Sequence, residues 1–153
     1  MCIGGKGAPT TPLMNSTKSW LDNGSGWQKL HEYSEHLILA MKVLLSGDAA
    51  ETGSSNGLQE TINATGNLRR FFKDSPGFPV MVDQALNQVP GLDQNWTWKT
   101  TGAGGEDAIL LIGKKSDTRS AAESLAKSGW VELDRPFARL PVTIDELSET
   151  GTA

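Results

Sequence analysis

The sequence predicts an α+β fold in which N-terminal helices pack on a small, mostly antiparallel sheet with one C-terminal helix. Apolar residues from Trp27 to Leu45 recur at gaps of three and four, which is the spacing of one helix face. Further along, Trp96 to Thr100 alternates large apolar with polar side chains, which is the period of a half-buried strand. A chain of 153 residues can bury one sizeable core, so we expect a single domain over residues 27–144.

The first 26 residues are predicted to form an extended arm. Their glycines and prolines argue against regular structure. Isolated apolar side chains on this arm would dock on the body or on a neighbouring subunit, and they are Ile3, Leu13, Met14, Trp20 and Leu21. The alternative is a disordered tail. At the other end, residues 145–153 are predicted to be an acidic, polar tail.

Three helices are predicted in the N-terminal half of the domain. Ser25 suits the N-cap of the helix over residues 27–45. A second helix begins at Asn56, and Gly66 within it marks either close packing on the first helix or a break. Pro79 fits the first position of a short third helix.

The C-terminal half is predicted to contain extended segments and one helix. Residues 96–100 and the continuous apolar run 108–112 would pair as a hairpin. Ser116 would cap a helix over residues 117–128. Two further extended segments are predicted at residues 130–133 and 137–144. The last is an edge segment, because it contains a proline, which cannot donate to a central ladder.

Charge and cysteine content argue against some classes of protein. The net charge is −4, and a surface of that sign does not attract nucleic-acid phosphates, so a general nucleic-acid binder is not expected. The single cysteine, Cys2, can form no internal disulfide, which favours the reducing cytoplasm or a virion assembled there. No apolar run reaches the length of a membrane-spanning helix, so no membrane span is expected.

The histidines of the first helix do not predict a metal site. His31 and His36 are five residues apart, so they diverge by roughly 140° around a helix axis and cannot hold one ion together. His31 with Glu35 is an ordinary pair one turn apart. Cys2 lies among glycines, without fixed neighbours that would activate its thiol. We therefore predict no catalytic residue, no metal and no cofactor.

The turn before the C-terminal helix is a candidate anion site. The segment Gly113 to Ser116 follows a strand and precedes a helix, but the glycine that a phosphate loop requires five positions earlier is replaced by Ala108. The free N–H groups of the helix N-terminus, with Lys114, Lys115 and Ser116, could still bind an anion. The alternative is a solvated strand-to-helix turn.

Tryptophans are frequent in this chain and gather in its strand-rich half. The chain has five tryptophans, and Trp96, Trp98 and Trp130 all fall in predicted strands. They could form a core of large rings, or a partner surface with much contact area at low entropic cost. Arg135, Phe137 and Arg139 follow closely, so we select this half as the predicted interface.

The opening residues carry a resemblance to a known group of proteins. Met1 to Pro12, MCIGGKGAPTTP, resembles the openings of some small virion-associated proteins of tailed bacteriophages. Those proteins also begin with methionine and cysteine and continue through glycine, lysine and proline. The resemblance implies a structural or ejected component of a virion.

The leading hypothesis is a non-enzymatic structural or interaction subunit of a larger homo- or hetero-oligomeric assembly, such as a phage virion. It would bind protein partners through the arm and the tryptophan-rich surface. A first alternative is a small enzyme or ligand-binding regulator that uses His31, Glu35 and His36 with the turn at residues 114–118. A second alternative is an acidic inhibitor or antitoxin-like protein that binds a basic partner.

Overall fold

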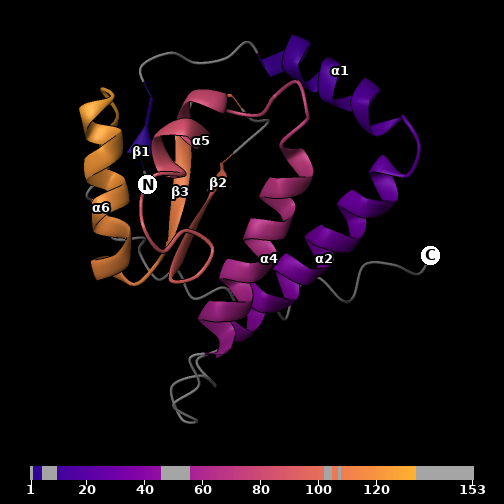
Figure 1. The fold of residues 1–153 in the computed structure, drawn as a ribbon. Coiled ribbons are helices and arrows are strands. Elements are labelled where there is room, and N and C mark those ends of the chain that lie inside the picture. The colour runs from indigo at the N-terminus through magenta and orange to yellow at the C-terminus, as the bar shows by residue number, and fades with distance from the viewer. Residues whose placement is uncertain (1, 5–9, 46–55, 102–104, 107, 134–153) are drawn as a thin grey trace, which may run out of the picture.

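The structure is a computed structural model that describes residues 2–4, 10–45, 56–101, 105–106 and 108–133 (Figure 1). In chain order, the described elements are β1 (Cys2–Ile3), α1 (Thr10–Leu21), α2 (Gly26–Leu45), α4 (Asn56–Phe72), α5 (Val80–Leu86), β2 (Trp96–Thr100), β3 (Ala108–Gly113), α6 (Lys115–Lys127) and β4 (Val131–Glu132). This arrangement confirms the predicted α+β class.

The sheet has four strands in the order β2-β3-β1-β4, and every neighbouring pair is antiparallel. β2 and β3 form the predicted hairpin, with a register that runs from Trp96 opposite Gly113 to Thr100 opposite Ile109. β1 lies between β3 and β4, where Cys2 stands opposite both Ile109 and Glu132. The sheet is therefore completed by the N-terminal residues. The predicted segment at residues 137–144 and the tail at residues 145–153 lie outside the described residues.

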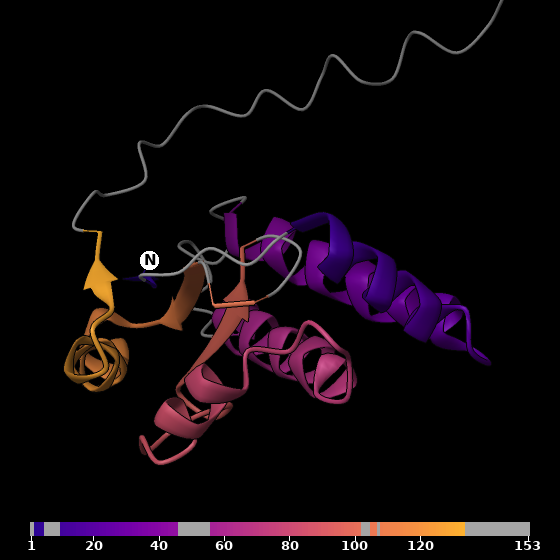
Figure 2. The same cartoon turned by 90° about the horizontal axis from the view of Figure 1, so that it is seen from above.

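The main core lies between one face of this sheet and helices α5 and α6 (Figure 2). Its buried members are Cys2, Val82, Leu86, Trp96, Trp98, Ile109, Ala121 and Leu125. Trp96 and Trp98 are 0% and 1% exposed, since alternate residues of a strand point to the same face. The indole Nε1 of Trp96 donates to the carbonyl of Pro90 at 2.9 Å, so this buried ring is satisfied.

Helix α4 lies beside the edge strand β2, and α2 packs on α4 from the outer side (Figure 1). Buried Leu37 and Ala40 of α2 meet Ala64 of α4 in a second apolar cluster. Gly57 permits the close approach, because a Cβ there would lie 3.3 Å from the backbone nitrogen of Leu44.

The N-terminal segment differs from the predicted extended arm, because Thr10–Leu21 forms helix α1. Pro12 is tolerated in the first turn, where backbone N–H groups have no intrahelical partner. Trp20 at the end of α1 packs on Phe71 and Phe72 of α4, with ring centroids 5.1 and 5.9 Å apart. Leu21 is 4% exposed. The prediction of an extended arm is therefore wrong for Thr10–Leu21, although Trp20 and Leu21 do dock on the body.

Cys2 also differs from its predicted place in a glycine-rich arm. It lies in β1 and is 2% exposed, as a member of the main core. Burial raises the pKa of its thiol, which keeps the thiol protonated at neutral pH. The residue contributes packing, since the thiolate rather than the thiol is the reactive form.

A largely buried charge cluster joins α4 to α5 and to the loop before β2. The Arg69 side chain is 8% exposed and lies 3.3 Å from the carboxylate of Asp83, and its other terminal nitrogen donates to Asp93. Asp93 also accepts from Arg70 and, at 2.7 Å, from the hydroxyl of Thr97. The guanidinium stacks over Trp98, 5.2 Å from the ring centroid.

Gly66 makes room for this cluster. A Cβ at Gly66 would lie 2.8 Å from the Asp93 carboxylate, which real Cβ contacts do not show. The glycine therefore faces Asp93. The predicted close packing of Gly66 on the first helix is wrong, as is the predicted break, because α4 continues through it.

We expect Gly66→Ala to destabilise the protein, although helix propensity alone favours alanine by about 1 kcal/mol. The added methyl displaces the Asp93 carboxylate and leaves buried Arg69 incompletely paired, which typically costs about 3–5 kcal/mol when a buried pair is broken. Chemical denaturation measures the free energy of unfolding. Asn63→Ala, at an exposed position of the same helix, is the control and should change stability little. A more stable Gly66→Ala protein would contradict this account.

Candidate functional site

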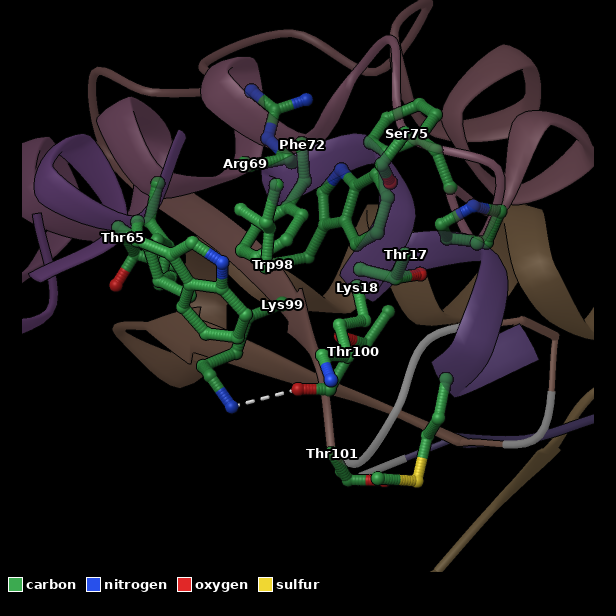
Figure 3. Close-up of a pocket in the computed structure, with 18 of the residues that line it drawn as sticks. Thr17, Lys18, Thr65, Arg69, Phe72, Ser75, Trp98, Lys99, Thr100 and Thr101 are labelled. Carbon is green, nitrogen blue, oxygen red and sulfur yellow. Dashed lines mark hydrogen bonds between the residues drawn. The ribbon is translucent and has the colours of Figure 1, made fainter. Parts of the chain in front are cut away.

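A pocket of about 710 Å³ lies between α1, the start of α2, the second half of α4 and the end of β2 (Figure 3). That volume is typical of small-molecule sites, which span roughly 300–1,000 Å³. Apolar side chains from all four elements form most of the wall, together with the loop before α5. They are Met14, Leu21, Trp27, Leu30, Leu68, Phe72, Phe78, Pro79 and Trp98. The N-terminal helix that the sequence analysis placed in an arm is thus one wall of this pocket.

Four polar atoms in this wall are buried without a hydrogen-bond partner. They are the hydroxyls of Thr17 and Thr65, the Nε of Arg69 and the indole Nε1 of Trp98. Among the described residues, these are all the buried side-chain polar atoms that lack a partner, and every one belongs to a pocket-lining residue. Such a group costs about 1–3 kcal/mol when it is left unpaired, so a concentration around one cavity needs a physical reason.

Comparable groups away from the pocket are paired. Thr61, one turn before Thr65 on α4, donates its hydroxyl to the carbonyl of Gly57 at 2.8 Å. The core hydroxyl of Thr97 and the indole of Trp96 also have partners. The unpaired atoms are therefore associated with the pocket and do not reflect poor packing of the protein in general.

The charged groups of the pocket are all basic. Lys18, Arg69 and Lys99 line it, whereas none of the described lining residues is acidic. Lys99 donates to the carbonyl of Thr100 at 2.7 Å, and no carboxylate pairs with it within the described ranges. Burial lowers the pKa of Lys99, since desolvation disfavours its charged form.

The polar and basic side chains of the pocket come from different elements. Figure 3 shows Arg69 of α4 and Trp98 of β2 together on the inner wall, while Thr17 and Lys18 enter from α1. Asp83 and Asp93 hold the terminal nitrogens of Arg69 from outside the pocket, which leaves Nε as its unpaired donor. The arrangement can hold an apolar group and offers hydrogen-bond donors and positive charge to it.

The residues of the predicted interface have different locations. Trp96 and Trp98 are fully buried, so the prediction that they form a partner surface is wrong and the alternative of a ring-filled core is confirmed. Trp130 packs partly buried against that core, and Leu13 and Trp20 are half-buried on α1. Ile3 belongs to β1, and its side chain is not among those described. Arg135, Phe137 and Arg139 lie outside the described residues.

The residues proposed for a small enzyme do not converge. His31, Glu35 and His36 are exposed on α2, where His31 and Glu35 make the expected contact at 3.5 Å. The turn at Lys114 begins α6, which lies on the other side of the sheet from α2 (Figures 1 and 2). Within the described part of the chain, no group of three or more His, Cys, Asp or Glu side chains is placed to hold a metal ion.

The candidate anion site at the start of α6 is a solvent-exposed turn. Lys114, Lys115 and Ser116 are exposed, and Lys114 occupies the N-cap position without a side-chain cap. The prediction that Ser116 caps the helix is therefore wrong. Asp117 lies in the first turn, where its carboxylate already suits the helix dipole.

Sequence reasoning missed the pocket, although α4 carries one readable signal. Thr61, Thr65 and Arg69 are spaced four apart, which places a polar stripe along one line of an otherwise apolar helix face. The other pocket residues are distant in sequence and become neighbours only in the fold.

No helix in the described ranges is long and apolar enough to cross a membrane. Comparisons with known proteins gave no matching family model, no matching curated protein and no matching solved structure.

Proposed function

We propose that the protein is a non-enzymatic ligand-binding protein that holds a small molecule with an apolar body in the pocket beneath α1. The single observation that carries this proposal is the coincidence of the pocket with the unpaired buried polar atoms. Proteins keep such groups at functional sites, where a ligand supplies the missing partner.

The apolar wall supports the same proposal. Small-molecule sites are mostly apolar concavities with a few polar groups that fix the orientation of the ligand. Here the rings of Trp27, Phe72 and Phe78 supply contact area, and the threonines and Arg69 supply the polar groups. The ligand-binding regulator expected from the sequence would use His31 and Glu35, whereas the site proposed here uses the residues of the pocket.

We expect the pocket to bind decan-1-ol, an uncharged apolar probe, and Thr17→Trp to weaken that binding at least tenfold. The indole fills the pocket from α1, whereas the matched Ser19→Trp adds the same ring at an exposed position of α1 outside the pocket. Isothermal titration calorimetry measures both affinities. Equal loss in both variants, or no saturable binding to the unmodified protein, would refute the proposed site.

We expect Thr65→Val to raise the free energy of unfolding of the ligand-free protein by about 1 kcal/mol, because it removes an unpaired buried hydroxyl of similar shape. The same change should weaken ligand binding, because a group that is kept for binding often lowers the stability of the ligand-free protein. Thr61→Val is the matched control on the same helix. Its hydroxyl is paired, so no gain in stability is expected there. Equal gains at both positions would show that Thr65 carries no special cost.

A second candidate is the interaction subunit of a larger assembly, and the second half of α2 favours it. Ile38, Leu39 and Leu45 are 54%, 59% and 76% exposed. Ile38 and Leu39 are adjacent, and exposed apolar side chains that lie together are typical of contacts with another chain. The partner would be another copy or another subunit. The resemblance of Met1 to Pro12 to virion-associated phage proteins makes a virion, or the cytoplasm in which one assembles, the proposed setting.

We expect Ile38→Glu with Leu39→Glu to lower the native mass of the assembled protein, because the new charges would be buried in the contact. Analytical ultracentrifugation measures the mass. Val80→Glu with Met81→Glu is the control, since it places the same charges on two adjacent exposed apolar residues at the start of α5. An unchanged mass in the α2 variant would refute this use of the α2 surface.

A further inference from the structure

We infer that the ligand is an amphipathic oxyanion, with an apolar body against the ring-lined wall and a carboxylate or phosphate head held between Lys18 and Lys99. This inference rests on the proposed ligand-binding function and specifies its chemistry. It follows from the sign of the charges in the pocket, from the type of the unpaired atoms and from the position of the two lysines on opposite walls.

The sign of the charge is the first argument. The chain as a whole has 18 acidic against 14 basic residues, yet the described pocket lining contains three basic residues and no acidic one. A local field opposite to the net charge selects an anion from solution. Lys99 is half-buried among apolar side chains, which lower the effective dielectric, so its charge acts more strongly there than on the open surface.

The type of unpaired atom is the second argument. The Nε of Arg69 and the Nε1 of Trp98 can only donate, so each can be satisfied only by an acceptor. The hydroxyls of Thr17 and Thr65 can also donate. An oxyanion offers several acceptors and no donor, and unlike a neutral carbonyl it also matches the positive charge of the lysines. A cationic head would leave both nitrogens unpaired and would face the like charges of Lys18 and Lys99.

The lysines are the third argument, because neither has a carboxylate partner among the described residues. Lys99 projects from β2 and Lys18 from α1, so the two ammonium groups approach the pocket from facing elements. The neighbouring cation Arg69 is already held by two carboxylates. A ligand head is therefore attracted most strongly by the two lysines, with which no acid of the described ranges competes.

The rings are the fourth argument and define the rest of the ligand. Apolar side chains make up most of the wall, and a simple ion such as free phosphate would leave that wall against water. An apolar body gains the burial free energy that this surface offers. The head and the body must therefore belong to one molecule.

Calorimetric titration of the full chain with four probes of equal chain length tests this inference. The probes are decanoate, decyl phosphate, decan-1-ol and decylammonium. We expect decanoate or decyl phosphate to bind at least tenfold more tightly than decan-1-ol, and decylammonium to bind most weakly. The tighter of the two anions identifies the head group, and either order supports the inference.

Variants locate the head. Lys99→Met should abolish most of the preference for the anion over decan-1-ol, and Lys18→Met should act in the same direction. Lys115→Met is the matched control, because Lys115 is an exposed lysine of α6 outside the pocket. Thermal unfolding of each variant shows that it is folded.

The possible failures are distinguishable. Decan-1-ol that binds as tightly as both anions would overturn the oxyanion inference and leave the proposed pocket function intact. No saturable binding of any probe would overturn both. A preference for the anion that disappears in Lys115→Met, and persists in Lys99→Met, would place the head at the start of α6 and overturn the inference.

Discussion

The charge cluster around Arg69 is the interaction on which the arrangement of the other elements depends. It connects α4 through Asp83 to α5, and through Asp93 to the loop that leads into β2. Removing these groups from water is expensive, and only good mutual pairing offsets the loss. Asp93 adopts a positive φ of 59°, so the chain accepts an uncommon backbone conformation where the carboxylate must reach both arginines. The glycine at position 66 leaves the space that this carboxylate occupies.

The same cluster determines which groups the pocket presents. Because the two carboxylates hold the terminal nitrogens of Arg69, its guanidinium lies over Trp98 and its Nε is left without a partner. Away from the pocket, the buried hydroxyls and indole compared above are satisfied. In the described part of the chain, every unpaired buried side-chain polar atom therefore belongs to a residue that lines this cavity, which is where a binding function is expected.

Local patterns in the sequence predicted the long elements well. The spacing of apolar residues gave α2, and the change to alternation gave β2 and its hairpin partner β3, because each pattern is a property of neighbouring residues. The N-terminal segment was misjudged because its glycines lie outside Thr10–Leu21 and its one internal proline occupies the first helical turn. β1 is only two residues long and is stabilised by pairing with β3 and β4, so no local sequence pattern predicts it.

Local sequence patterns could not predict the candidate site, for a different reason. Its lining extends from Met14 to Thr101 and comes together only when α1 folds over the end of α4. Periodicity placed Trp98 in a half-buried strand, but Trp96, Thr97 and Trp98 are all buried, because the edge strand β2 is covered on both faces. Nor could periodicity show that Arg69 would find two carboxylates, since Asp83 and Asp93 follow it by 14 and 24 residues.

Helix α2 relates the two proposed binding surfaces. Its first turns contribute Trp27 and Leu30 to the pocket, whereas Ile38 and Leu39 are exposed further along. A helix of 20 residues is about 30 Å long, so a ligand at one end leaves the other end accessible to a partner. The two functions are therefore compatible in one molecule. Any effect of the ligand on assembly would have to travel through α2 and its packing on α4, where Leu37 and Ala40 meet Ala64.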